Sequence, residues 1–545
     1  MKYTLFNPSA PESHDVGPAL NIGGSDDIYG ASSIQTFSTG AKPLGATHAD
    51  AQGFLDWYGR WNRGNFWFKD AGAKVWGYEE TFDNWQDTYG MDAVRVFYHS
   101  GHGGMDSNGV FYAPLGAKWD GRDTAISSNM IIGNEDLRYL LWSTCQSLKV
   151  PDLAVMNATR KSPVDTWGPG NRGLRMIFGF HSNSLDSPHY GRNFGNNWNA
   201  GQSFSDAWIN ASWAISHNHI CTVCAMGATG TEAQNRLFQE RLFFGGMSST
   251  AWYWWRWGGF ENPVFGTVVA DKDLPKKAKL LEFAPNQFDE TRLAQLGSLF
   301  GFTKKQTDTL ALGRDGSLVV VGSKGKQLTV DAEGRLLATL APMNHQNTKA
   351  LTREKAVEIA EKTVSAAGFR SDNVKLKFDS VRVGMAQGGT GQGSGTLENP
   401  YQSDTTVIFR QTAEGLSSIN AGHGLVMITL DNDGTVTNIH NSTRPVANVS
   451  TQPRMLVNSP ETDESDQPRN LLSINQEATR TLSEAAGQNF KVSRANQPIG
   501  AQQLESTVGY DFSGPYGTVV VNREYEVSAG GIFEKRYKVR IPIFA

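Results

Sequence analysis

In the first half of the chain, short apolar runs bounded by small and turn-forming residues alternate with segments of helical periodicity. DAVRVFYHS (92–100), YLLWS (139–143) and GLRMIFGF (173–180) have the length and composition of buried strands. Between 203 and 215, apolar residues recur at i, i+3, i+4, i+7 and i+11, which predicts an amphipathic helix. This alternation favours an α/β fold with a mostly parallel sheet, in which sites lie beyond the carboxyl ends of the strands.

The second half shows a different pattern, in which amphipathic helices precede β meanders. TREKAVEIAEKTVSAAGF (352–369) predicts a helix with Thr352 as its N-cap, and a DNDG turn joins predicted strands at 424–430 and 435–440. Tryptophan vanishes from about residue 275, and DKDLPKKAKL (271–280) is typical of a linker. We therefore expect three regions, namely an α/β domain over 1–270, an α+β region over 280–450 and a further small α+β module over 455–545.

Composition limits the classes of function. With 545 residues, 39% hydrophobic and 19% charged, the chain is long enough for two to four globular domains. The formal net charge of −4 gives no electrostatic basis for binding nucleic acid or an anionic membrane. No apolar run approaches the roughly 20 residues needed to span a bilayer. The N-terminus lacks the apolar core of a signal peptide, so a cytoplasmic location is the default expectation, with secretion left open.

Two reactive side chains follow neighbouring predicted strands. The first strand ends in SGHGG (100–104) and the next in STCQS (143–147), and 43 positions separate His102 from Cys145. That spacing leaves room for one crossover helix and the next strand, which would bring the two residues to one edge of one sheet. The alternative is packing, because free cysteine is often buried and a histidine can sit in a turn.

This order of motifs resembles the caspase–gingipain–legumain superfamily of cysteine peptidases (clan CD) over residues 85–235. The segment from RGLRMIFGFHS to SFSDAWINA is also similar to the region after the catalytic cysteine in its CHAT branch. The resemblance implies a caspase-like α/β/α sandwich, with His102 as general acid/base and Cys145 as nucleophile. It also implies that the N–H groups of Gly103 and Cys145 form an oxyanion hole. The chemistry agrees, since an imidazole can activate a thiol and oriented N–H groups stabilise the charge of the transition state.

Three positions qualify this interpretation. His99 competes with His102, but only His102 is followed by glycine. Metacaspases and legumains carry an acid two positions before the cysteine, where this chain has Ser143, so no cleavage preference for Arg, Lys or Asn follows. Asp186 falls in a region that lines the substrate pocket in relatives, and a solvated loop acid is the alternative.

Two further stretches are expected to belong to the core. HNHICTVC (217–224) carries ligand types that suit zinc, but alternation along a strand would place Cys221 and Cys224 on opposite faces. We therefore predict a core strand there and neither a metal nor another cofactor. AWYWWRWGGFENP (251–263) is either a packing element or an aromatic substrate wall, and we favour packing.

The region over 280–450 is similar to PepSY and thermolysin-type propeptide modules, which inhibit or chaperone peptidases. The stretch that carries the likeness runs from TTVIFRQ to NSTRPV (405–446). It implies an intramolecular contact with the first domain. We therefore expect a cysteine endopeptidase that acts on a peptide or protein substrate and is regulated by its C-terminal modules. The alternatives are an acyl-transfer enzyme with the same His–Cys dyad and an inactive pseudo-peptidase that binds a partner.

Overall fold

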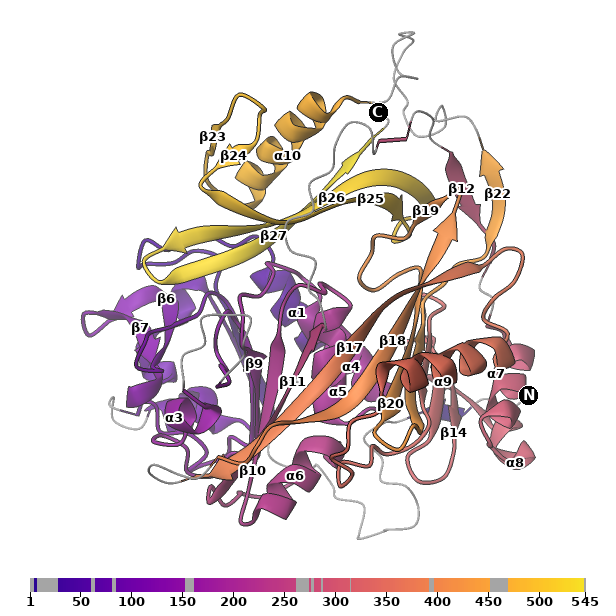
Figure 1. Ribbon diagram of the computed structural model, residues 1–545. Coiled ribbons are helices and arrows are strands. Elements are labelled where there is room, and N and C mark those ends of the chain that lie inside the picture. Colours follow the sequence, from indigo (N-terminus) through magenta and orange to yellow (C-terminus); the bar gives the residue numbers. More distant parts are fainter. Residues whose placement is uncertain are drawn as a thin grey trace.

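The computed structural model describes residues 4–6, 28–59, 64–80, 85–151, 161–260, 274–275, 279–285, 288–313, 315–391, 397–450 and 469–543. Most of the predicted linker at 271–280 lies outside these residues. Most described strands join one 17-stranded sheet that continues from the first region into the second (Figure 1). Three smaller sheets complete the fold.

The first region builds a parallel sheet in the order β3-β2-β4-β8-β9. These strands are β2 (Tyr29–Ser33), β3 (Phe66–Lys69), β4 (Val96–Ser100), β8 (Tyr139–Ser143) and β9 (Met176–Phe180). Antiparallel β10 (Cys221–Gly227) and β11 (Trp252–Phe260) extend it. The three strands predicted from the apolar runs are thus confirmed, and so is the coarse α/β class.

The two faces of this sheet are covered differently. One face packs against α1 (Thr47–Tyr58), α4 (Tyr190–Asn199), α5 (Phe204–Trp213) and α6 (Gly230–Gln239). The other face carries the short helices α2 (Trp85–Tyr89) and α3 (Pro163–Trp167) and a small antiparallel sheet of β5 (Gly104–Met105), β6 (Phe111–Trp119) and β7 (Arg122–Ile126).

The crossover between β4 and β8 is this small sheet, so the expectation of a crossover helix is wrong. The reason is local. Asp120 and Gly121 both have positive φ (48° and 72°), which is the geometry of a tight turn between two twisted strands. The Asp-Gly pair in KWDGRD is the signal for that hairpin.

The second region extends the same sheet. Here β17 (Lys375–Thr390) pairs with β11 over nine residue pairs, so no break in strand pairing separates the two regions. The order continues through β18 (Tyr401–Ala413), β20 (Leu425–Asp431), β21 (Val436–Asn441), β16 (Leu336–Thr339), β15 (Gln327–Val330), β14 (Leu318–Val321), β13 (Leu310–Gly313) and β1 (Thr4–Phe6).

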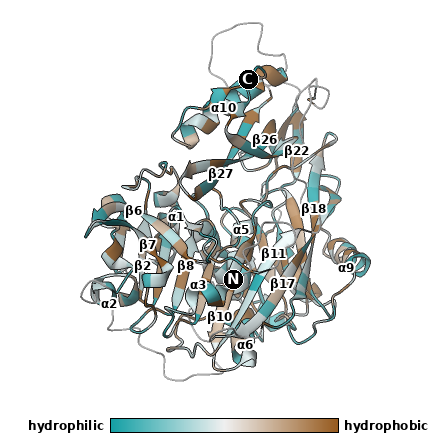
Figure 2. Cartoon of the chain, turned by 60° about the vertical axis from the view of Figure 1, so that its left-hand side comes forward, coloured by the Kyte–Doolittle hydropathy of each residue, from teal (hydrophilic) through white to brown (hydrophobic). Residues whose placement is uncertain are grey.

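Helices α7 (Glu290–Leu299), α8 (Lys304–Thr307) and α9 (Arg353–Ala366) belong to this region. The predicted N-cap is confirmed, because the Thr352 side chain accepts from the Lys355 N–H. In Figure 2, hydrophilic positions predominate on α9, which lies at the edge of the molecule.

The last region forms a separate sheet. It contains β12 (Leu280–Phe283), β22 (Val446–Ser450), β25 (Ala501–Asp511), β26 (Tyr516–Gly530) and β27 (Phe533–Pro542), with α10 (Leu471–Ala485) packed beside them. The short strands β23 (Lys491–Val492) and β24 (Pro498–Ile499) form a two-stranded sheet of their own, whereas β19 (Leu416–Ser417) pairs with β18 in the large sheet. Figure 1 shows the hairpin of β26 and β27 lying across the first region.

The two stretches expected in the core are buried. On β11, Tyr253 and Trp255 lie on one face of the sheet and Trp254 on the other, each at most 5% exposed, so the aromatic run packs. Cys221 and Cys224 occupy opposite faces, as alternation predicts. Among the described residues no helix is both long and apolar enough to cross a membrane.

Candidate active site

The loops that carry His102 and Cys145 touch at the carboxyl ends of β4 and β8. These strands are direct parallel neighbours, with Ser100 opposite Ser143. Gly103 lies against the second loop, and a Cβ atom added there would come within 2.7 Å of the Cys145 carbonyl oxygen and 2.9 Å of Thr144 Cβ. Glycine is therefore the residue that permits this approach. Both the imidazole of His102 and the thiol of Cys145 are fully buried.

The surroundings of His102 define its protonation state. Its Nε2 lies 2.9 Å from the Lys42 carbonyl oxygen, which can only accept, so Nε2 carries the proton. Its Nδ1 has no hydrogen-bond partner in the described part of the chain. Burial, and secondarily the charge of Lys535, lower the pKa of His102 to about 3. The imidazole is thus neutral near pH 7, with a free lone pair on Nδ1.

The sulfur of Cys145 faces the segment that follows β9. It accepts the Ser184 N–H at 3.2 Å and lies 3.6 Å from Ser184 Oγ. The N–H groups of Gly103 and Cys145 donate to no backbone carbonyl of the described residues.

Strand β27, from the last region, covers the surroundings of His102 and Cys145. It pairs with the segment after β9, where the Arg536 N–H donates to the Ser184 carbonyl (3.2 Å) and the Asp186 N–H to the Arg536 carbonyl (2.9 Å). This pairing inserts Lys535, which is only 2% exposed. Its Nζ donates to the Gly101 carbonyl (3.4 Å) and to Ser184 Oγ (3.1 Å). A residue of the last region therefore bridges the loop of His102 and Ser184, the residue whose N–H contacts the Cys145 thiol.

The two predicted pocket residues have different surroundings. The Ser143 side chain faces helix α1, where its hydroxyl donates to Asp50 Oδ2 at 2.8 Å. Asp186 stays beside the site, and its carboxylate accepts the N–H groups of Gly45 and Ala46. Burial raises the pKa of Asp186, while the charge of Lys535 opposes that shift. Of the two, only Asp186 lies on the segment that pairs with β27.

His99 belongs to the packed face of the sheet. Its Nδ1 lies 2.9 Å from the Tyr78 hydroxyl, and its ring packs 4.9 Å from that of Trp142. Burial, with Lys535 as the next cause, lowers the pKa of His99 to about 3. Its Nε2 lies where a Cβ on Gly101 would come within 2.8 Å. His99 therefore packs against Gly101, in the loop that carries His102.

Asp50 is a supporting residue that the sequence did not reveal. This buried carboxylate on α1 accepts hydroxyl hydrogen bonds from Tyr98, Ser100 and Ser143, each at 2.8 Å, and the Gly191 N–H. Burial raises the pKa of Asp50 against these four donors. It links the ends of β4 and β8 beneath the site. An acidic residue in the first turn of a helix is usually exposed to solvent, so the local sequence gives no sign that Asp50 is buried.

The candidate metal ligands have other partners. His217 Nε2 lies 3.1 Å from the Ala421 carbonyl oxygen and His219 Nε2 2.9 Å from that of Ser212. The described residues contain no group of three or more His, Cys, Asp or Glu side chains arranged to hold a metal ion.

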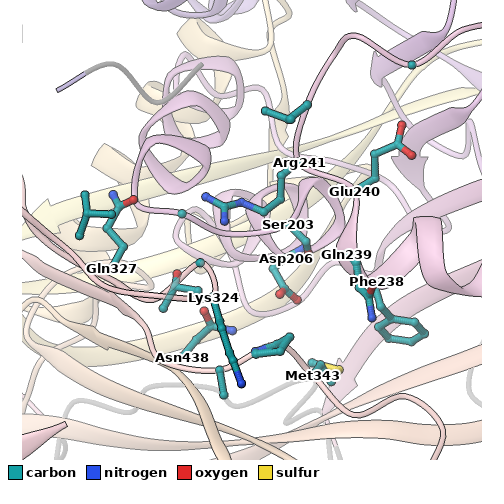
Figure 3. A pocket seen from close by; sticks show the side chains of 18 of the residues that line it. Ser203, Asp206, Phe238, Gln239, Glu240, Arg241, Lys324, Gln327, Met343 and Asn438 are labelled. Carbon is teal, nitrogen blue, oxygen red and sulfur yellow. The ribbon is translucent and has the colours of Figure 1, made fainter. Parts of the chain in front are cut away.

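A cavity of about 720 Å³ lies at the opposite, amino-terminal edge of the parallel strands (Figure 3). Arg175, directly before β9, and Lys324, in the β14–β15 turn, line it together with Asp206 and Glu240. Both acids are neutralised, Asp206 by Arg256 and Glu240 by Arg175. None of the predicted site residues lines this cavity.

Comparison with known proteins matches one region. A family model described as a domain of unknown function, DUF6345, matches residues 31–259. No curated protein and no solved structure matches the chain. The matched residues run from within β2 into β11 and include the parallel strands β3, β4, β8 and β9, so the part of the chain that carries His102 and Cys145 is the part similar to DUF6345.

Proposed function

We propose that the first region is a cysteine peptidase-like hydrolase of caspase-like α/β/α architecture that cleaves peptide bonds with His102 and Cys145. One observation carries the proposal. The two residues follow adjacent parallel strands, and the His102 imidazole is neutral and fixed through Nε2, while its Nδ1 has no hydrogen-bond partner among the described residues, the Cys145 thiol included. A general base needs that protonation state.

The steps follow from these positions. His102 Nδ1 takes the thiol proton as Cys145 Sγ attacks the substrate carbonyl, and the N–H groups of Gly103 and Cys145 bind the resulting oxyanion. The carbon–nitrogen bond then breaks, and the imidazolium protonates the leaving amine. Water, deprotonated by the same imidazole, hydrolyses the thioester and restores the thiol. The Lys42 carbonyl holds the Nε2 proton throughout.

In this proposal the C-terminal region regulates the enzyme by covering the site. Lys535 fills the space between Gly101 and Ser184, and its charge opposes the imidazolium that the first step forms. Substrate therefore reaches Cys145 only when β27 moves away. The described conformation is then the resting form.

Site-specific labelling of Cys145 by a thiol-reactive peptide electrophile, located by mass spectrometry, tests the proposal. Cys145→Ala should abolish turnover, because a nucleophile contributes orders of magnitude in rate. His102→Ala should slow labelling at least about a hundredfold, within the range for general acid–base catalysis. His99→Ala is the matched histidine control and should do much less. Labelling that is equally fast in His102→Ala and wild type would exclude the dyad.

Lys535→Met tests the cover, since methionine fills a similar space without charge. We expect labelling of Cys145 to accelerate by about tenfold, which corresponds to about 1.4 kcal/mol of closure. A wild-type rate in this variant, with an unchanged circular dichroism spectrum, would refute inhibition by Lys535. No labelling in any variant would favour the pseudo-peptidase.

The full burial of Cys145 supports one second candidate. If β27 closed again over the acylated thiol, it would exclude water and favour transfer of the acyl group to an amine over hydrolysis. Mass spectrometry of products formed with an added amine separates ligation from hydrolysis.

A further inference from the structure

A different cavity, which no step above uses, lies where the three regions of the chain meet. Its volume is about 580 Å³. Its wall comes from the segment after β9, the loop at 420–423, the turn between β15 and β16, and the outer part of β27. We propose that it binds a small anion with two or more phosphate groups, which holds β27 against the first region.

Cations from all three regions face this cavity. The charged side chains of its wall are the cations Arg192, Arg335, Lys538 and Arg540 and the carboxylates Asp186 and Glu333. Arg192 belongs to the first region and Arg335 to the second. Lys538 and Arg540 lie two positions apart on β27 and so point to the same side of the strand. Guanidinium groups bind phosphate oxygens through paired N–H donors, which favours phosphate as the ligand.

Two of the four cations have no carboxylate partner. Arg335 pairs with Asp331 (2.7 Å), and Arg540 with Asp511 (3.1 Å). By contrast, Arg192 donates to His189 Nδ1 at 3.0 Å, and neither it nor Lys538 forms an ion pair with a carboxylate of the described residues.

The environment of Lys538 disfavours its charged form. Its Nζ donates to the Ile215 carbonyl at 2.9 Å. Burial lowers the pKa of Lys538, although Glu524 and Glu505 act on it in the opposite direction. Glu524 and Glu505 thus offset part of the charge of Lys538, but its ammonium and the Arg192 guanidinium contact no carboxylate among the described residues, so both can pair with an anion.

The two histidines of the wall report the same positive field. Burial lowers the pKa of His189 and of His423, to about 4 for His423, and the next cause is the charge of Arg192 at His189 and of Arg335 at His423, while Glu333 and Asp511 act in the opposite direction. Neutral imidazoles can donate one N–H each to a phosphate oxygen without adding charge. The volume falls within the range of small-molecule sites.

An anion here would act on the covering strand. Lys538 lies three residues after Lys535 on β27, so a ligand that joins it to Arg192 would hold Lys535 in place. This consequence rests on the proposed function, whereas binding itself does not. Without the ligand, no anion joins Arg192 of the first region to Lys538 of β27, and that restraint on Lys535 is lost.

Calorimetric titration of the full chain with tripolyphosphate tests the binding. We expect saturable binding with one ligand per chain, weakened at least about tenfold in Arg192→Ala and in Lys538→Met. Lys324→Ala, a cation at the other cavity, is the matched control and should bind as wild type does. Since Arg192 is exposed, Arg192→Ala decides the question even if Lys538→Met fails to fold.

Three results would overturn the proposal. These are no saturable binding by the wild-type chain, wild-type affinity in Arg192→Ala, and tighter binding of citrate than of tripolyphosphate, which would make the ligand a carboxylate. Labelling of Cys145 with and without saturating tripolyphosphate tests the clamp. Slower labelling supports it, and an unchanged rate refutes it. If no chain labels at all, the proposed function fails, but the calorimetric result stands.

Discussion

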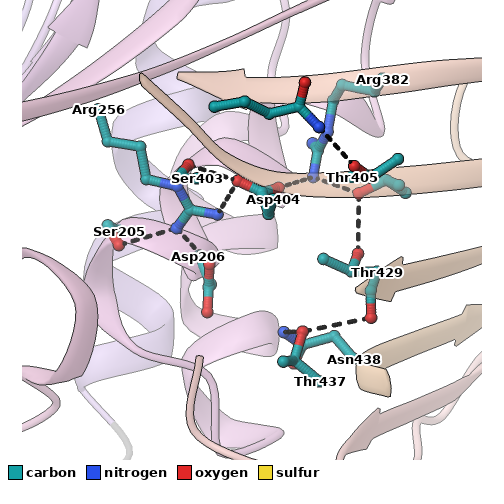
Figure 4. Close-up of polar contacts among 12 residues, drawn as sticks. Ser205, Asp206, Arg256, Arg382, Ser403, Asp404, Thr405, Thr429, Thr437 and Asn438 are labelled. Carbon is teal, nitrogen blue, oxygen red and sulfur yellow. Dashed lines mark hydrogen bonds and ion pairs between the residues drawn. The ribbon is translucent and has the colours of Figure 1, made fainter. Parts of the chain in front are cut away.

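The junction between the first two regions depends on a buried cluster of charges, and removing one carboxylate should destabilise both regions. Arg256 on β11, Arg382 on β17 and Asp404 on β18 are each at most 2% exposed (Figure 4). Asp404 accepts Arg256 at 2.9 Å and lies 4.0 Å from Arg382. Asp206 on α5 accepts the other end of Arg256 at 2.5 Å.

The cluster is ionised. Burial alone would raise the pKa of Asp404, but the charges of Arg256 and Arg382 outweigh burial and lower it. Two guanidinium groups face two carboxylates, so the set is neutral. Asp404→Asn would leave two buried cations against Asp206 alone.

The magnitude follows from this imbalance. Removing one partner of a buried ion pair costs about 3–5 kcal/mol, because the remaining charge stays desolvated. We therefore expect Asp404→Asn to lower the free energy of unfolding by about 3 kcal/mol or more. The control is Asp308→Asn, whose partner Lys304 has a side chain 87% exposed. Such surface pairs contribute less than about 1 kcal/mol.

Urea unfolding at neutral pH measures the difference, followed by tryptophan fluorescence and by far-ultraviolet circular dichroism. All tryptophans lie in the first region, so fluorescence reports on that region and dichroism on the whole chain. We expect both transitions to shift together, since Asp404 lies across the junction. A shift of less than about 1 kcal/mol, equal to that of Asp308→Asn, would refute the assignment.

Three further predictions follow from particular contacts. Gly103→Ala should lower the free energy of unfolding by about 1–3 kcal/mol, because the added Cβ would meet the Cys145 carbonyl oxygen. The same variant should slow the labelling of Cys145, and a wild-type labelling rate would contradict this. The free energy of unfolding should decrease as the pH is lowered below about 6.5. Burial lowers the pKa of His102, His181 and His440 to about 3 in the folded chain, so the unfolded chain binds protons at these histidines first. Each such histidine costs about 2 kcal/mol at pH 5, so equal urea midpoints at pH 5 and 7.5 would refute the reasoning. A chain ending near Val269 should aggregate in light scattering, because it exposes the β11 edge that pairs with β17; a monomer would contradict this.

The sequence predicted those elements whose pattern is local. The helix after Thr352 and the strands before His102 and Cys145 follow from periodicity and caps alone. The pairing of β11 with β17 could not be predicted, because partners more than a hundred residues apart leave no local trace. The end of β17 also falls in the glycine-rich stretch from 388, which is typical of a loop.

The site was predictable only in part, for a related reason. A histidine before glycine and a cysteine after an apolar run are visible in one dimension. Lys535 is not, since a lysine in FEKRYKVRIP (533–542) normally marks the solvated face of a strand. Its burial depends on a partner surface built some 350 residues earlier.

The same contacts that close the site also set the conditions for its chemistry. While Lys535 is in place, burial and its positive charge hold the imidazole of His102 neutral, so it can accept a proton only at a high cost in free energy. When β27 leaves, water enters and the positive charge withdraws, and both changes raise the pKa of His102 toward the ordinary value near 6.5. A base with that pKa can take the thiol proton and return it near neutral pH. Under the proposed function, the bare Nδ1 lone pair therefore exists in the closed form but becomes catalytically useful only in the open form, which would make the position of β27 the variable that an activating signal changes.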